Sequence, residues 1–212
     1  MKIKKIHDIS KKIHPDMVVW PGDPSMKAEK HLSISKGDLC NLSSVNMGVH
    51  TGTHADSPYH FIDGGSTIES LDLSRFIGFV KVFEISNPEY ISEDDIKDLP
   101  IEKDDAVFFK TANSSVPEEA PFNENFIYLH ESAAKFLVEK GVKTVGVDYF
   151  SVDSFHSTTH SAHKILLSNN LSIIENLYLK DVEEGKYLFS CLPLKISGAD
   201  GSPVRAVLVE LE

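Results

Sequence analysis

The clearest pattern in the chain is an amphipathic stretch followed by a short apolar run. Apolar residues recur every three or four positions over residues 131–140, which predicts a helix, and Gly141 stands where helices commonly end on glycine. Residues 144–147 then predict a buried strand that ends at Asp148. A helix, a glycine and a buried strand in this order are typical of an α/β unit.

The same patterns predict further strands and helices along the chain. Strands are predicted at residues 6–10, 17–20, 42–49, 79–85, 106–109, 172–174 and 204–211. A second helix is predicted over residues 161–169, and Ser92 followed by three acidic residues predicts a helix N-terminus. No repeat and no Gly/Ser-rich or Pro-rich linker divides the sequence, so residues 1–212 are expected to form one α/β domain with a mixed β-sheet and packed helices.

The composition narrows the classes of partner. Of 212 residues, 32 are Asp or Glu and 21 are Lys or Arg, which gives a formal net charge of −11. Nucleic acids and anionic membrane surfaces attract clustered cations, so neither is expected as a partner. No membrane span or secretory signal is predicted. Cys40 and Cys191 form no C-x-x-C pair and are expected to be reduced, which favours a cytoplasmic protein.

Histidine is unevenly distributed, and its densest cluster carries the candidate chemistry. Of the ten histidines, His50, His54 and His60 lie within eleven residues, together with Asp56. On a helix, Asp56 and His60 would rotate away from the other two, whereas on an extended chain four even-numbered side chains share one face. A glycine and a proline within the segment also disfavour a helix. We therefore expect an extended, irregular segment that presents these side chains to one cavity.

Two imidazoles and a carboxylate form a ligand set that suits zinc, manganese or ferrous iron. A second cluster contains Asp153, His156, His160 and His163, and Glu175 follows it. On the predicted helix His160 and His163 can share a face, and the helix and the next strand can bring Glu175 to the same sheet edge. Spacing alone leaves open whether these residues are ligands or ordinary polar residues.

These motifs resemble the cyclase superfamily, which includes bacterial kynurenine formamidases. The segment His50-Thr-Gly-Thr-His54-Ala-Asp56-Ser-Pro-Tyr-His60 is similar to the family signature H-x-G-T-H-x-D-x-P-x-H. The resemblance spans nearly the whole chain. It continues at Asp8-Ile9-Ser10, Trp20-Pro21-Gly22-Asp23, His163 with Leu166-Leu167, Ile174-Glu175-Asn176-Leu177 and residues 198–206.

The resemblance implies a swivelling β/β/α-type fold and a binuclear metal site. We expect two divalent metal ions there, with zinc preferred and manganese as the alternative. The implied ligands are His50, His54 and Asp56 for one ion, and Asp56, His163 and Glu175 for the other, with Asp56 bridging. His60 would be the catalytic acid/base, and Trp20 would line the substrate pocket. The resemblance also implies a homodimer or homotetramer.

The implied activity is metal-dependent hydrolysis of a small aromatic amide, as in an arylformamidase that converts N-formylkynurenine into kynurenine and formate. Hydrolysis of a cyclic amide such as isatin is an alternative, and so is a non-catalytic, metal-stabilised module that binds a small molecule. Because a structural site needs no free acid/base, His60 favours an enzyme. Tyr149 and Phe150 depart from the Asp-Thr-Pro-Ser pattern of kynurenine formamidases, and whether they, His156 or His160 line the pocket stays open.

Overall fold

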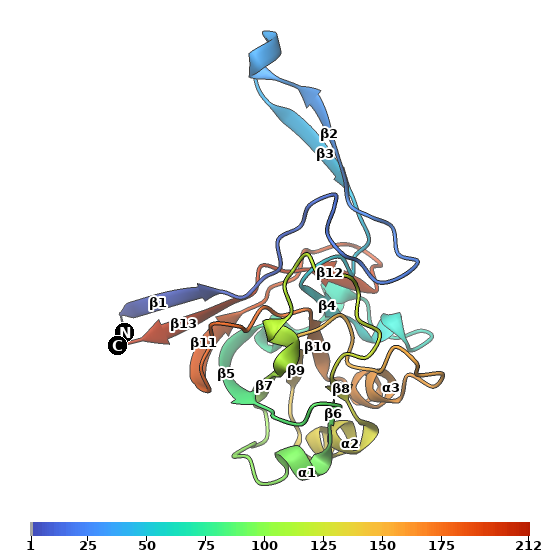
Figure 1. Cartoon of the computed structure of the whole chain (residues 1–212), viewed down its shortest axis with the longest axis vertical. Helices are drawn as coiled ribbons and strands as arrows, with labels where there is room; N and C mark the ends of the chain where they lie inside the picture. The colour runs from blue at the N-terminus through green and yellow to red at the C-terminus, as the bar shows by residue number, and fades with distance from the viewer. Residues whose placement is uncertain (1) are drawn as a thin grey trace.

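A mixed sheet forms the centre of the computed structural model, which describes residues 2–212 (Figure 1). Its strands are β1 (Ile3–Asp8), β4 (His54–Asp56), β5 (Ile77–Glu84), β7 (Ala106–Lys110), β9 (Thr144–Val147), β10 (Ser172–Glu175), β11 (Gly185–Ser190), β12 (Gly201–Pro203) and β13 (Val207–Leu211). The nine strands follow the order β1-β13-β11-β5-β7-β9-β10-β4-β12. Strands β5, β7, β9 and β10 run parallel, and the outer pairs are antiparallel. The expected mixed-sheet α/β fold is confirmed.

The central strands are buried on both faces, as their continuous apolar runs require. One face carries Val107, Val145 and Ile173, which pack against the helices α1 (Glu93–Ile96), α2 (Glu131–Lys140) and α3 (Ser161–Ser168). The opposite face carries Phe108 and Ile174, which pack inside the curl of the sheet with side chains from β5, β11 and β13. Two separate cores therefore hold the parallel strands in place, and the helices gather on one side (Figure 1).

Both long helices occur where the apolar spacing predicts them. Helix α2 ends at Gly141, whose φ of 74° is the left-handed conformation expected of a C-terminal glycine. The strand predicted at residues 17–20 is wrong, because this segment forms turns and has no strand partner. Trp20 instead packs edge-on against Phe122, so burial of its ring explains the apolar run. The short strands β11 and β12 were not predicted.

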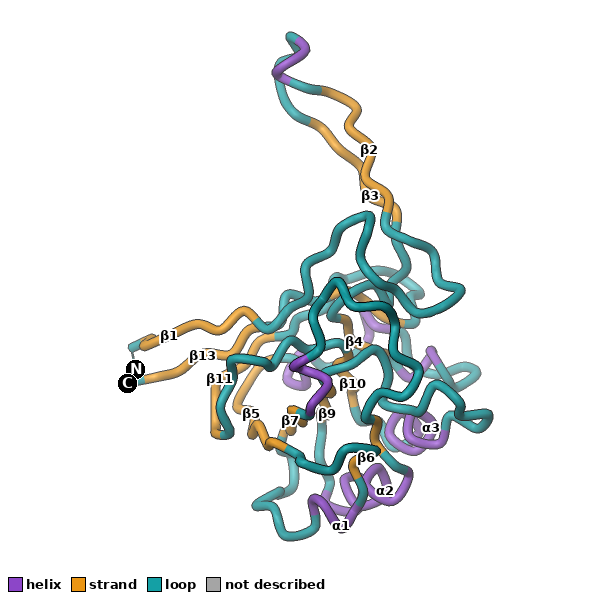
Figure 2. The backbone as a smooth tube through the Cα atoms, viewed as in Figure 1, coloured by secondary structure: helices purple, strands orange, loops and turns teal. Residues whose placement is uncertain are grey.

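A second, separate ribbon projects from the body of the molecule (Figure 2). Strands β2 (Lys27–Leu32) and β3 (Leu42–Asn46) pair antiparallel, and every residue in them is exposed. We call residues 27–46 the arm. Near its tip, Ile34 is 59% exposed and Leu39 is fully exposed. A small parallel pair, β6 (Tyr90–Ile91) and β8 (Tyr128–Leu129), completes the strands.

Among residues 2–212, none of the helices has the length and apolar character needed to cross a bilayer.

Candidate metal centre

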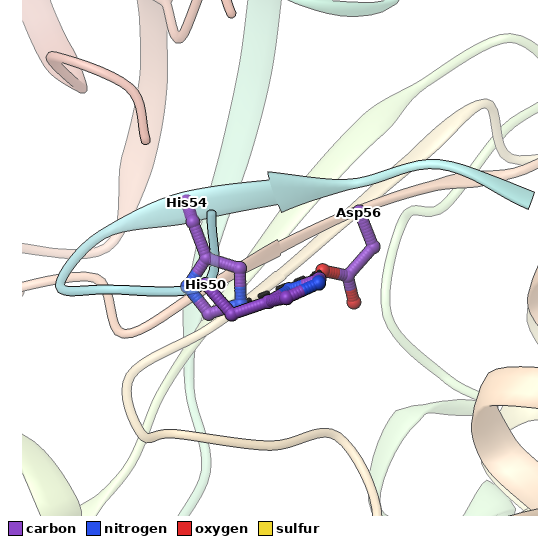
Figure 3. A group of neighbouring side chains, drawn as sticks. All are labelled: His50, His54 and Asp56. Atoms are coloured by element: carbon purple, nitrogen blue, oxygen red, sulfur yellow. Dashed lines mark hydrogen bonds and ion pairs between the residues drawn. The ribbon is translucent and has the colours of Figure 1, made fainter. Parts of the chain in front are cut away.

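The candidate site lies beside the carboxyl end of β10, where β4 pairs with it. His54 lies directly opposite Glu175 in this antiparallel pair, and Asp56 lies opposite Ile173. Residues of a strand alternate between faces, so His54 and Asp56 point to one side while Ala55 is buried in the core on the other. The predicted extended geometry is therefore present over β4 (Figure 3).

The rest of the histidine segment is not extended. His60 ends a 3-10 turn, Pro58–His60, and its ring stacks on that of His50 with 4.0 Å between centroids. His50 approaches the strand β12 so closely that a Cβ at position 201 would lie 2.7 Å from its Cε1 atom. Gly201 is thus required by the position of His50, and His60 reaches the site through a turn rather than through strand alternation.

His163 enters the site from the first turn of α3. Its Nδ1 atom lies 2.7 Å from Oδ2 of Asp153. The same carboxylate accepts hydrogen bonds from the backbone N–H groups of Ala162 and His163. Asp153 therefore fixes both the start of the helix and the orientation of the imidazole.

Each of the three buried or half-buried histidines is held through one ring nitrogen. His163 is bonded to Asp153, His54 Nδ1 lies 2.8 Å from the carbonyl oxygen of Gly52, and His50 Nε2 lies 2.9 Å from Oδ2 of Asp200. Such outer partners set the ring orientation of metal-binding histidines in general. The second ring nitrogen of each histidine is left facing the centre of the site.

The remaining ring nitrogens converge on two carboxylates. Nδ1 of His50 and Nε2 of His54 lie 3.0 Å and 3.4 Å from Oδ1 of Asp56. Nε2 of His163 lies 3.4 Å from the other oxygen, Oδ2 of Asp56, and 3.2 Å from Oε1 of Glu175. Glu175 Oε2 lies 3.3 Å from Nε2 of His54. The two oxygens of Asp56 thus face two different groups of candidate ligands.

Two atoms of this cluster are buried without a hydrogen-bond partner among residues 2–212. They are Oδ2 of Asp56 and Nε2 of His163. Buried polar atoms are nearly always paired in native proteins, so these two atoms point to a bound group. A divalent cation fits, because the cluster offers imidazole and carboxylate donors and no thiolate. This cluster is capable of binding a divalent metal ion.

The charges of the site are strongly coupled. Burial lowers the pKa of His50, but the hydrogen bonds and charges of Asp56 and Asp200 outweigh it and raise that pKa to about 9. Burial raises the pKa of Asp56, but the neighbouring imidazoles of His163 and His50 hold it well below its usual value. Burial lowers the pKa of His60, so its imidazole is neutral near pH 7 and able to take up a proton.

The cluster opens into a pocket of about 220 Å³. Trp20, Phe61 and Phe150 form its apolar wall. The Trp20 ring packs against that of Phe155, with 5.2 Å between the ring centroids. His160 also lines this pocket, whereas His156 lines a different, shallow cavity beside His130.

All the residues predicted from the motifs meet in this pocket or directly beneath it: Trp20, His50, His54, Asp56, His60, His163 and Glu175. Sequence reasoning missed the role of Asp200, which reaches both His50 and His60. Asp200 belongs to the 198–206 motif, but nothing in its spacing indicated which histidine it meets.

Fold and site together define an α/β protein with a cluster of histidine and carboxylate side chains that can bind a divalent metal ion at one end of a curled sheet. The family model described as "Putative cyclase" matches residues 7–154, and the chain belongs to this Cyclase family. It is 34% identical over 208 residues to the kynurenine formamidase of Bacillus cereus (strain ATCC 10987 / NRS 248), covering 98% of this chain and 99% of that protein.

Solved structures agree with this assignment. A structure described as a "predicted metal-dependent hydrolase from Bacillus stearothermophilus" superposes with a TM-score of 0.86 at 35% identity and covers 98% of both chains. Isatin hydrolase A from Labrenzia aggregata superposes with a TM-score of 0.85 at 21% identity, over 98% of this chain and 94% of that one. The second similarity is one of fold.

Proposed function

We propose that the protein is a metal-dependent arylformamidase that hydrolyses N-formylkynurenine to kynurenine and formate. The observation that carries the proposal is the convergence of three imidazole nitrogens on the carboxylates of Asp56 and Glu175, next to the neutral imidazole of His60. The full-length similarity to kynurenine formamidases supports the substrate. Isatin hydrolases are similar in fold at 21% identity, which gives a cyclic amide less support.

The proposed cofactor is a pair of divalent ions, with zinc preferred over manganese. The division of ligands between the two oxygens of Asp56 supports two ions: His50 and His54 would hold one, and His163 and Glu175 the other. When bound, such a pair activates water and polarises a carbonyl group.

His60 is the proposed acid/base. Its neutral imidazole takes a proton from the attacking water and gives it to the nitrogen that leaves as the amine. Stacking on His50 and the carboxylate of Asp200, 3.4 Å from Nδ1, hold the ring in place. Trp20 and Phe150 supply a flat apolar wall for the aromatic ring of the amide and exclude water from that side.

A hydrolysis screen tests this function. The purified protein is loaded with zinc or manganese and assayed with N-formylkynurenine, formanilide and isatin. Hydrolysis of the two formamides supports the proposal. Hydrolysis of isatin alone would assign the cyclic-amide activity instead. Metal-dependent thermal stabilisation without turnover of any of the three would replace the enzyme with a binding module.

The proposed assembly is a homo-oligomer, with a homodimer as the simplest form. An isolated two-stranded ribbon is at best marginally stable in water, yet the arm extends away from the body and exposes Leu39, Leu42 and Val45. A second copy of the chain would cover these side chains, since most assemblies of one protein are closed and symmetric.

The proposed location is the cytoplasm. Both cysteines are free thiols, Cys40 exposed and Cys191 buried, as a reducing compartment favours. Cell fractionation of the native host tests this location.

A further inference from the structure

Residues 198–201 are held in place by hydrogen bonds to two other segments of the chain. The backbone N–H and the hydroxyl of Ser57 both donate to the carbonyl oxygen of Asp200, at 3.0 Å and 2.9 Å. The backbone N–H of Gly198 donates to Oε1 of Glu69 at 2.8 Å. The main chain of Asp200 is therefore fixed beside the site, although 41% of its side chain is exposed.

A single oxygen of Asp200 contacts two imidazoles. Its Oδ2 atom lies 2.9 Å from Nε2 of His50 and 3.4 Å from Nδ1 of His60. The two rings are stacked with 28° between their planes, so one oxygen beside the stack reaches both of them. Among residues 2–212, no other carboxylate pairs with His60.

These contacts specify which nitrogen of each ring carries the proton. A carboxylate only accepts hydrogen bonds, so the ring nitrogen that faces it is the protonated one, and the other nitrogen of a neutral imidazole is basic. Metal binding requires a neutral imidazole. His50 is then protonated on Nε2 and keeps a basic Nδ1, which lies 3.0 Å from Oδ1 of Asp56. His60 is protonated on Nδ1 and keeps a basic Nε2.

The basic nitrogen of His60 decides what this ring can do in a reaction. A general base needs an unprotonated nitrogen within reach of the proton that it removes. His60 lines the metal pocket, and one of its ring nitrogens lies within 4.8 Å of a carboxylate oxygen of Asp56 and a ring nitrogen of His163. Because Asp200 occupies Nδ1, Nε2 is the nitrogen that is left for a substrate proton. The opposite tautomer would present an N–H group in its place.

We propose that Asp200 is a positioning residue that sets opposite tautomers in the stacked pair. His50 offers Nδ1 to the metal centre, and His60 offers Nε2 to the proton that moves in the reaction. The inference rests on the proposed function, in which His60 is the acid/base. It adds the atom that carries the proton and the residue that selects this atom.

Nuclear magnetic resonance tests the tautomers directly. The zinc-loaded protein is labelled with histidine that contains the heavy nitrogen isotope, and long-range proton–nitrogen correlations show which ring nitrogen is protonated. The signals of His60 are those that disappear in His60→Gln. We expect the Nδ1–H form in the wild type. Asp200→Asn fills the same space, but its amide donates as well as accepts, so we expect the Nε2–H form to appear.

Two further variants show whether the carboxylate itself is responsible. Asp200→Glu only accepts hydrogen bonds, as aspartate does, and is expected to keep the Nδ1–H form of His60. Glu69→Gln makes the same chemical change as Asp200→Asn and contacts the same segment through Gly198. It is the matched control and is expected to leave both the spectrum and the rate unchanged.

Steady-state kinetics measure the consequence for the reaction. At saturating zinc, Asp200→Asn is expected to lower kcat for formanilide about 10- to 100-fold and to leave KM nearly unchanged, because the tautomer affects the proton transfer and not the binding of substrate. Asp200→Glu is expected to restore most of kcat. Zinc content is measured for every variant.

The tautomer measurement needs no turnover, so it tests the inference even if the protein hydrolyses no formamide. An Nδ1–H form of His60 that persists in Asp200→Asn would overturn the inference, whatever the rate. So would an unchanged kcat in a variant whose tautomer has changed, or an equal loss of kcat in Glu69→Gln. Loss of zinc from Asp200→Asn at saturating zinc would also overturn it, since Asp200 would then hold the metal rather than position the acid/base.

Discussion

Strands β3 and β4 are neighbours along the chain, yet they differ in burial at every position. All five residues of β3 are exposed, whereas all three residues of β4 are buried. β4 lies between β10 and β12 and is covered by a core, whereas β3 pairs with β2 alone. The candidate ligands are therefore fixed by contacts within this chain, and the arm is a surface whose apolar side chains need contacts from elsewhere.

The largest effect is expected on the buried strand β4, which carries Asp56. Asp56→Asn removes the charge that both groups of ligands face, and an amide offers one oxygen in place of two. We expect the loss of bound metal and a fall in kcat/KM of more than about 1,000-fold. Metal analysis and formamide hydrolysis measure both. The matched control is Glu29→Gln on the exposed strand β2, which leaves metal content and rate unchanged.

The variant His60→Gln tests whether His60 acts as a metal ligand or as the acid/base of the reaction. Because His60 is not needed to hold the metal in this proposal, the variant is expected to keep its metal and to lose about 100- to 1,000-fold in kcat. Metal content and initial rates on formanilide are the measurements. Loss of metal together with activity would show that His60 is a ligand, and full activity would remove its proposed role.

The difference between the two strands also explains which parts of the site the sequence predicted. Strand alternation and apolar runs predicted the buried framework, so His54, Asp56 and the helix that carries His163 followed from local pattern. The contacts of Asp200 with His50 and His60 join distant segments of the chain, and local pattern contains no information about such contacts. In the arm, the strand predicted at residues 42–49 corresponds to β3, whereas β2 was missed because none of its residues is buried.

The arm is expected to control assembly. Leu39→Asp combined with Ile34→Asp places charge on its apolar tip, so we expect a particle mass of twice 23.5 kDa or more for the wild type and 23.5 kDa for the variant. Light scattering after size exclusion measures the masses. Lys36→Ser, at the same tip, is the control and keeps the wild-type mass. A monomeric wild type would contradict the proposed assembly.

The smallest effect is expected at β1, a largely exposed strand that ion pairs connect to β13. Glu210 on β13 pairs with Lys4 at 2.9 Å and His7 at 2.7 Å on β1. Hydrogen bonds from Lys4 and His7 lower the pKa of Glu210 from 4.5 to about 2. A carboxyl group whose pKa is lower in the folded state stabilises that state above its unfolded pKa, and this contribution is lost as the pH falls from 4.5 towards 2. Glu210→Gln is therefore expected to lower Tm slightly at pH 7, with a difference from the wild type that narrows below pH 4.5. Thermal unfolding followed at several pH values measures it. A difference that stays constant down to pH 3 would show that the charge of Glu210 does not cause the loss, and no difference at pH 7 would show that the ion pairs add nothing to the backbone ladder.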